Sequence, residues 1–169
     1  MGRYNDVFYE VPYDEPIPEE DLREAEASFW LDEGLMVRRE GSLRKALDCF
    51  DEVIRLCPDH WEAWYRKGET FHRLGKIDEA IRCYDRASEI DPSRGEPMLK
   101  KGALLRRNGR FEEALEWLDK ALKAQPGRAL IWMNKGMVLE AMGRMDEARD
   151  CFRMAQRISA DARKGTDHR

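Results

Sequence analysis

The sequence of 169 residues lacks the features that mark membrane and secreted proteins. It has no apolar run approaching the roughly 20 residues that a helix needs to cross a bilayer. Its first residues, MGRYNDVF, do not show the basic and then apolar order of a secretory signal. Asp6 also breaks the pattern required for N-myristoylation. We therefore expect no membrane partner and a cytoplasmic location.

The sequence shows no constellation of catalytic residues. The three histidines, His60, His72 and His168, have no metal-ligating partner at helical spacing. No glycine-rich loop follows a strand in the way that a phosphate-binding loop does, because the glycines follow a different spacing. These absences predict a protein that is not an enzyme, with no catalytic residues, no metal site and no cofactor.

The four cysteines do not form a zinc or disulfide pattern. None belongs to a close Cys-x-x-Cys pair, and Cys49, Cys83 and Cys151 recur at multiples of one spacing, while Cys57 precedes a proline. If this spacing reflects a stack of similar helical units, as described below, the three cysteines occupy equivalent positions in different units. Such positions lie about 10 Å apart, which is too far for a disulfide. We interpret these cysteines as small apolar residues of the core.

A pattern of glycines, alanines and prolines recurs through the chain with a period of 34 residues. Such a period is typical of a solenoid, in which each unit hides its apolar face against its neighbours. Four copies are present, more than the roughly three that such a stack needs for stability. The recurring positions are Gly34, Gly68, Gly102 and Gly136; Gly41, Gly75, Gly109 and Gly143; Ala46, Ala80, Ala114 and Ala148; and Pro58, Pro92 and Pro126.

The pattern resembles the tetratricopeptide repeat (TPR), a family whose unit is an antiparallel helix pair. The resemblance is carried by the opening Trp-x-x-x-Gly, by a Gly-x-x-x-x-Ala turn with an apolar third residue, and by the closing proline. Repeats 1 to 4 would span 27–60, 61–94, 95–128 and 129–162. One departure is that Glu33, Lys67, Lys101 and Lys135 occupy a position where the family usually has leucine. A lysine stem can cover apolar surface there while its charged head reaches water.

The resemblance implies an all-α fold, a right-handed α-solenoid of four antiparallel helix pairs. We expect the array to span 18–162, because Pro18 and the acids after it suit the first turn of a helix that runs into repeat 1. Residues 1–17 would be an extended N-terminal arm, and 163–169 a C-terminal tail.

The arm is acidic and aromatic. Residues 1–26 hold nine acids and two arginines, a balance of −7, so the remainder carries +3 of the total charge of −4. Two interpretations of the arm remain open. Its aromatic residues either dock in a binding groove of the array, or cover the open face of repeat 1, where Phe29 and Met36 have no preceding repeat to meet.

In proteins of this resemblance the first helices of the repeats line a concave groove that binds peptides. The positions here indicate an apolar floor with a basic rim, which favours a partner segment with large apolar side chains and some acids. We interpret the protein as a scaffold for protein–protein interaction, and the sequence does not identify the partner. The candidate groove residues are Leu31, Leu35, Arg38, Tyr65, Arg66, Glu69, His72, Arg73, Leu99, Lys100, Ala103, Arg106, Met133, Asn134 and Met137.

Some relatives bind the C-terminal carboxylate of chaperones through a lysine and an asparagine on the first groove helix. Those positions hold Leu31 and Leu35 here, and Glu96 replaces a supporting basic residue. Only Lys100 is compatible, so we do not expect that activity. Nucleic acid is not expected either, because the array carries only +3 and acids interrupt its basic stripe.

Repeat 4 differs from the others. It has Arg149 and Gln156 where repeats 1 to 3 carry mostly apolar residues, which is typical of a repeat that ends an array. It also holds five methionines, an adaptable residue common at contact surfaces. Self-assembly through this repeat, for instance as a homodimer, is the alternative interpretation of the function. The five are Met133, Met137, Met142, Met145 and Met154.

Overall fold

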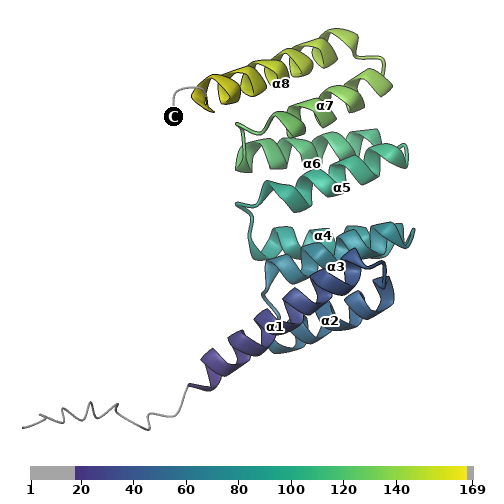
Figure 1. The fold of residues 1–169 in the computed structure, drawn as a ribbon. Helices are drawn as coiled ribbons and strands as arrows, with labels where there is room; N and C mark the ends of the chain where they lie inside the picture. The colour runs from purple at the N-terminus through teal and green to yellow at the C-terminus, as the bar shows by residue number, and fades with distance from the viewer. Residues whose placement is uncertain (1–17, 167–169) are drawn as a thin grey trace, which may run out of the picture.

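The computed structural model of the protein describes residues 18–166, with side chains to residue 163. Within these residues all regular structure is helical, and eight α-helices follow one another as four antiparallel pairs (Figure 1). The helices are α1 (Glu19–Arg39), α2 (Leu43–Leu56), α3 (Trp61–Arg73), α4 (Ile77–Ile90), α5 (Gly95–Arg107), α6 (Phe111–Ala124), α7 (Ala129–Ala141) and α8 (Met145–Thr166). The predicted all-α array of helix pairs is confirmed.

The turn inside each pair depends on a glycine in the left-handed region. Gly75 has φ of 75°, a conformation that costs a residue with a Cβ roughly 1 kcal/mol or more. The chain can then fold back, and the N–H of Lys76 donates to the carbonyl of Phe71 at 2.9 Å. This hydrogen bond satisfies one of the free carbonyls at the end of α3.

A second glycine lets the two helices of a pair approach closely. A Cβ added to Gly68 on α3 would lie 2.7 Å from Cε1 of Tyr84 on α4, closer than the two atoms can pack. Gly136 has the same relation to Phe152 on α8. The spacing of glycine and large residue seen in the sequence is therefore a packing requirement.

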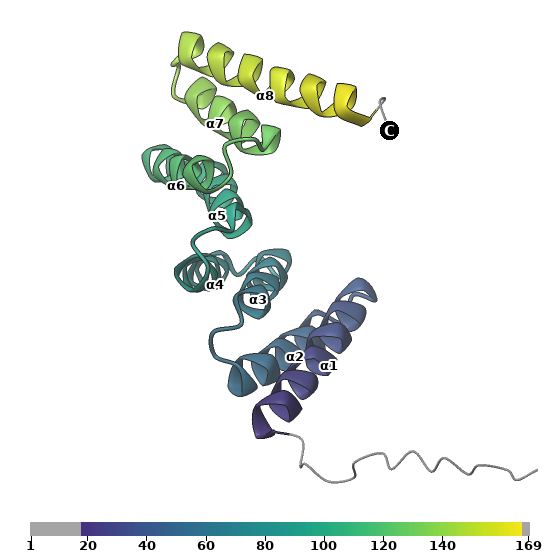
Figure 2. The same ribbon diagram turned by 90° about the vertical axis from the view of Figure 1, so that its left-hand side faces the viewer.

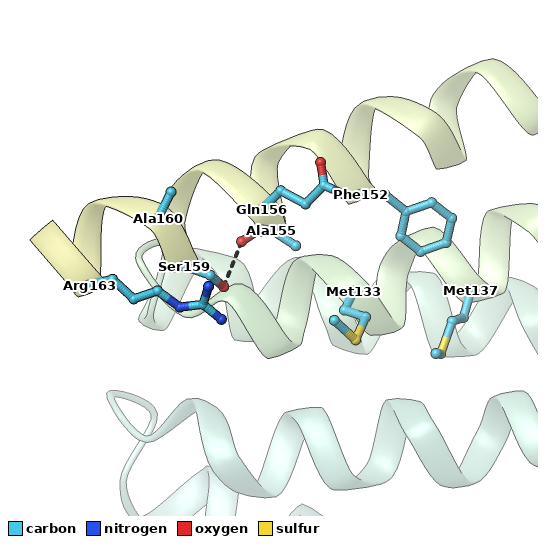
Figure 3. Close-up of a pocket in the computed structure, with 8 residues that line it drawn as sticks. All are labelled: Met133, Met137, Phe152, Ala155, Gln156, Ser159, Ala160 and Arg163. Atoms are coloured by element: carbon cyan, nitrogen blue, oxygen red, sulfur yellow. Dashed lines mark hydrogen bonds between the residues drawn. The ribbon is translucent and has the colours of Figure 1, made fainter.

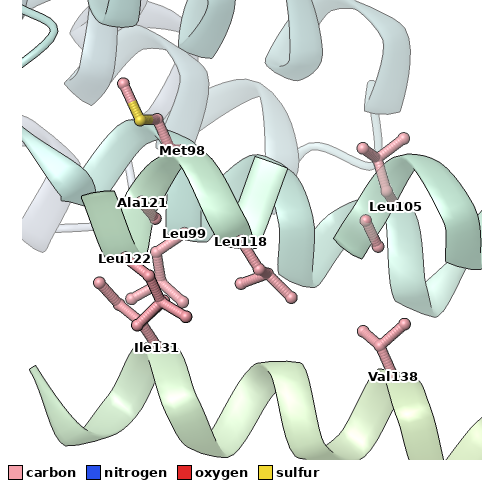
Figure 4. Close-up of a cluster of buried hydrophobic side chains, with 9 residues drawn as sticks. Met98, Leu99, Leu105, Leu118, Ala121, Leu122, Ile131 and Val138 are labelled. Atoms are coloured by element: carbon pink, nitrogen blue, oxygen red, sulfur yellow. The ribbon is translucent and has the colours of Figure 1, made fainter. Parts of the chain in front are cut away.

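The four pairs stack in chain order, so that repeats 1 and 4 form opposite ends of the molecule (Figure 1). Figure 2 shows the stack as a curve, with α4 and α6 on the outer side and α3 and α5 on the inner side. The core is shared between neighbouring repeats. In Figure 4, Leu99 and Leu122 of repeat 3 lie beside Ile131 of repeat 4, and Leu118 belongs to the same cluster.

The lysines that depart from the family pattern form ion pairs between repeats. Each reaches an aspartate 16 residues earlier, on the second helix of the preceding repeat. The head of Lys101 also lies 3.9 Å from the centre of the Trp117 ring. The expectation that each lysine covers apolar surface with its stem while its ammonium group reaches water is therefore only partly right. The ammonium groups are instead paired with aspartates. The pairs are Lys67–Asp51, Lys101–Asp85 and Lys135–Asp119.

Both terminal helices are longer than their counterparts. α1 begins at Glu19, next to the predicted start at Pro18 and eight residues before the equivalent of Trp61. α8 continues to Thr166, eight residues beyond the equivalent of Ala124, so helix occupies part of the stretch predicted as a tail. The arm of residues 1–17 lies outside the described residues, and both interpretations of it remain predictions.

Candidate functional site

The predicted groove residues all lie on the first helices of the repeats. They differ in exposure, and they divide into a buried set, a charged set and an apolar set at the C-terminal end. Leu31, Leu35 and Arg38 are on α1; Tyr65, Arg66, Glu69, His72 and Arg73 on α3; Leu99, Lys100, Ala103 and Arg106 on α5; and Met133, Asn134 and Met137 on α7.

The expectation of an exposed apolar floor is wrong at its two central residues. Tyr65 is 7% exposed and Leu99 is 3% exposed, and both belong to hydrophobic core clusters. The reason is that the next repeat covers them. Leu104 of α5 belongs to the Tyr65 cluster, and Ile131 of α7 belongs to the Leu99 cluster. Tyr65 and Leu99 therefore pack between repeats and leave little surface for a ligand.

The flanking apolar residues are half-buried. Leu31 and Leu35 pack against the core cluster of repeat 1, and Ala103 is partly covered on α5. They leave only small apolar patches on the inner side of the stack.

Glu69 is the centre of a charged cluster that joins three repeats. Its carboxylate pairs with Arg38 of α1 at 3.3 Å, with Arg66 of α3 at 3.2 Å and with Lys100 of α5 at 2.8 Å. It also accepts a hydrogen bond from the Tyr65 hydroxyl at 3.1 Å. The fold therefore brings together five of the predicted groove residues, from three helices, around a single carboxylate.

Titration of this cluster follows from its burial and its charges. Burial acts to raise the pKa of Glu69, but the hydrogen bond and charge of Lys100, with Arg38 and Arg66, outweigh it and lower the pKa. Burial raises the pKa of Tyr65, and the nearby charge of Glu69 raises it further. Glu69 is therefore ionised and Tyr65 is a neutral donor at neutral pH.

The inner side of α3 and α5 has an excess of positive charge. Partial burial lowers the pKa of His72, and the positive charges of Arg107 and Lys100 lower it further. Arg73 and Arg107 are exposed at the ends of the two helices. In addition, the Nε of Arg106 is buried without a hydrogen-bond partner among the described residues. Anionic groups would be attracted to this side.

The methionines of α7 belong to a separate apolar hollow of about 620 Å³ between α7 and α8. Figure 3 shows Met133 and Met137 of α7 together with Phe152 of α8 on its walls. The α8 residues were not predicted. Their signal in the sequence was available, since Phe152 and Gln156 are equivalent to residues that pack between repeats elsewhere. The lining residues are Met133, Met137, Phe152, Ala155, Gln156, Ser159, Ala160 and Arg163.

Asn134 belongs to none of these three sets, and its side chain donates to the Leu130 carbonyl of its own helix at 2.9 Å. The aspartates at 51, 85 and 119 were also missed, although they recur with the period of the repeat. A comparison of charged residues, as well as apolar ones, between equivalent positions would have found them.

Other kinds of site are not found in the part of the chain that the structure describes. No group of three or more histidine, cysteine, aspartate or glutamate side chains in this part is arranged to hold a metal ion. None of the described helices has both the length and the apolar character to span a membrane. Cys49, Cys83 and Cys151 are buried as expected, and burial raises the pKa of Cys83 to about 11.

Solved structures with the same fold include those of MamA, PilF and YrrB. A crystal structure of MamA matches with a TM-score of 0.76 and 21% identity, over 86% of each chain. PilF of Pseudomonas aeruginosa matches at 0.73 and 21%, over 80% of this chain and 62% of its own. YrrB, described as a TPR protein with an unusual peptide-binding site, matches at 0.68 and 21%, over 83% and 73%. At these identities the likeness concerns the fold.

Family models give the assignment. No curated protein matches the sequence closely enough to be informative. Two models described as tetratricopeptide repeat match residues 61–94 and 99–163, together more than half of the chain. With the glycine-capped helix pairs and their stacking, these matches show that the chain belongs to the tetratricopeptide repeat family.

Proposed function

We propose that the protein is a non-catalytic scaffold that binds an extended, acidic segment of a partner protein along the inner side of α3 and α5. One observation carries the proposal. Three cations from three helices, Arg38, Arg66 and Lys100, converge on the single carboxylate of Glu69. Arg73 and Arg107 lie beyond this cluster and are exposed, so the side is suited to a ligand that supplies carboxylates.

The burial of Tyr65 and Leu99 changes the expected ligand. Among the predicted groove residues of α1, α3 and α5, the apolar ones that a partner could still touch are Leu31, Leu35 and Ala103, and all three are half-buried. Acidic residues therefore contribute more to recognition than the sequence indicated. Because the cations are partly exposed, their attraction for an acidic peptide should weaken as salt is added. The Debye length of the solution is about 8 Å at physiological ionic strength, so more distant charges are largely screened.

A displayed library of random peptides, selected on the full chain, tests this function. Enriched peptides are expected to carry several acids. The variant Arg73→Glu/Arg107→Glu reverses two exposed charges at the end of the inner side. It should weaken binding of a selected peptide by at least about tenfold, since like charges across an interface cost several kcal/mol.

The matched control reverses two exposed cations on the outer helices. Arg82 lies on α4 and Lys123 on α6, so Arg82→Glu/Lys123→Glu makes the same change in net charge. Peptide affinity should stay within about twofold of the wild type. Selection of peptides without acids, or equal losses in both variants, would remove the inner side as the binding surface.

Self-assembly through repeat 4 is the second candidate function. The observation that favours it is the exposure of its methionines, which are 41% exposed at Met133, 37% at Met137 and 56% at Met145. Exposed apolar side chains gathered beside a hollow are typical of contact surfaces.

A further inference from the structure

The two ends of the stack carry the two halves of the interface that joins neighbouring repeats. Ile131 and Val138 of α7 are fully buried against repeat 3, as Ala63 is against repeat 1. Among the described residues, no repeat packs against the equivalent residues of α1. Phe29 is therefore 61% exposed and Met36 is 49% exposed.

Repeat 4 carries the complementary half. Leu99 and Leu118 receive the helix of the next repeat and are 3% and 0% exposed, while their equivalents are Met133, which is 41% exposed, and Phe152. These two residues line the hollow between α7 and α8 (Figure 3). The hollow thus lies where the first helix of a fifth repeat would pack.

We propose that α1 of one copy of the protein packs into the hollow between α7 and α8 of another, so that copies stack head to tail. Phe29 and Met36 would occupy the places that Ile131 and Val138 occupy within the chain. This inference rests on the second candidate function and names its contact surface. It does not involve the inner side of α3 and α5.

A reversed ion pair supports this occupant. Inside the chain a lysine on each first helix pairs with an aspartate on the preceding second helix, as Lys101 does with Asp85. At the two ends both signs are exchanged. α1 has Glu33 at the lysine position, and α8 has Arg153 at the aspartate position. A head-to-tail junction would therefore form an ion pair of opposite polarity at this position.

Arg153 is able to make this pair. Its partner within the chain is Asp150 on the same helix, and the two side chains are 69% and 66% exposed. Such a surface pair contributes little to stability and is readily exchanged.

The extra lengths of α1 and α8 also match. α1 begins eight residues early, and α8 ends eight residues late, relative to the equivalent helices. In the stack, the end of a second helix lies beside the start of the next first helix, so the two extensions would run side by side. Leu22, 53% exposed, lies seven residues before Phe29 and therefore on the same side of α1.

Charge along these helices is complementary too. Residues 19–33 of α1 hold seven acids and one arginine, whereas residues 149–163 of α8 hold four arginines and two aspartates. Small residues, Ser159 and Ala160, line the hollow where α8 is extended and allow a helix to approach.

The geometry makes the contact intermolecular and directional. The two surfaces lie at opposite ends of the stack (Figure 1), so one chain cannot join its own ends. A junction of two different surfaces builds rings or open filaments. Gln156, at the position of the buried Leu122, makes the junction more polar than the internal ones. Association should therefore depend on concentration.

Charge reversal with mixing tests the proposal. Sedimentation velocity of the full wild-type chain should show a mass that rises with concentration. Glu33→Arg alone places a positive charge opposite Arg153, and Arg153→Glu alone places a negative charge opposite Glu33. Each variant should lose association by at least about tenfold, because like charges then face each other.

An equimolar mixture of the two variants should regain association. The positive charge introduced at position 33 of one chain then meets the negative charge introduced at position 153 of the other. The unchanged Glu33 of the second chain meets the unchanged Arg153 of the first, so both kinds of junction carry opposite charges. Circular dichroism of each variant checks that the helices and the thermal midpoint are retained.

Other results would overturn the proposal. A wild-type chain that stays monomeric at all concentrations indicates that something else covers α1, such as residues 1–17 of the same chain. Association that persists in both variants, or that the mixture fails to restore, indicates another surface, including a dimer of repeat 4 with itself. Binding of a selected acidic peptide to the Glu33→Arg variant tests the scaffold function separately. Unchanged peptide binding would show that the head-to-tail contact can fail while the scaffold function holds.

Discussion

Single glycines fix the distance between the two helices of each repeat. Gly68 shows the point, because Tyr84 occupies the space that a side chain would need. Tyr84 is fully buried and cannot turn aside without disturbing the core between α3 and α5.

We therefore expect Gly68→Ala to lower the free energy of unfolding by about 1–3 kcal/mol, the usual cost of overpacking a core. The control is Gly127→Ala, since a Cβ at Gly127 meets nothing within 4 Å. Urea denaturation of both variants measures the difference. Equal stabilities would show that the helices separate at no cost.

The ionised carboxylate of Glu69, on the inner side, contributes to the stability of the folded protein. Its pKa is lowered in the folded protein, so its contribution is fully present above its ordinary value of 4.5 and is lost as the pH falls through the lowered value. The cations that surround Glu69 belong to α1, α3 and α5.

The variant Glu69→Gln should be less stable than the wild type by about 1.5–3 kcal/mol at pH 7, the range for hydrogen bonds to charged groups. The difference should shrink as the pH falls below 4.5, because the Glu69 carboxylate is then neutralised by protonation, first in the unfolded chain and at lower pH in the folded protein. Urea denaturation at pH 7 and at acid pH measures both values. A difference that does not change with pH would contradict the assignment.

Within a helix, the same position has different roles along the array. Leu99 on α5 and Met133 on α7 are equivalent, yet Leu99 is covered by the next repeat and Met133 is not. Neighbouring repeats therefore convert a surface residue into a core residue.

Leu99→Ala should cost about 2–5 kcal/mol, as for other leucines removed from a core. Met133→Ala, as the matched control, should cost less than about 1 kcal/mol when the protein is dilute. Thermal and urea unfolding of the two variants give the comparison. If Leu99→Ala lost peptide binding but kept its stability, Leu99 would contact the peptide directly, contrary to its assignment to the core.

For the molecule as a stack, stability depends on position. A repeat in the middle packs against two neighbours, and a repeat at either end packs against one. The first two turns of α1, from Glu19, and the last two turns of α8, up to Thr166, extend beyond the equivalent helices of the other repeats.

Amide hydrogen exchange in dilute protein should therefore be slowest in α5 and α6 and fastest in these two extensions. Local opening of the extensions breaks few apolar contacts, whereas opening of α5 breaks the core cluster shared by repeats 3 and 4. Mass spectrometry of peptic fragments measures the rates. Uniform protection from α1 to α8 would mean that the stack unfolds only as a whole.

The number of repeats, the pairing of helices and the helices that carry the groove positions could all be predicted from the order of residues. These features follow from local spacing. A glycine that must adopt positive φ, such as Gly75, and a glycine that must face a large residue, such as Gly68, are visible without knowledge of the fold. The burial of three cysteines followed from the same register.

Which side of each first helix remains accessible could not be predicted in this way, because it depends on how the repeats pack. Tyr65 lies one residue after Trp64, a rotation of about 100° around the helix, and the angle between repeats determines which neighbour covers that side. In the stack, the next repeat covers Tyr65 and Leu99 and leaves Met133 open. The same packing brings Arg38, Glu69 and Lys100 together, because charged residues 31 positions apart become neighbours only when the helices are stacked.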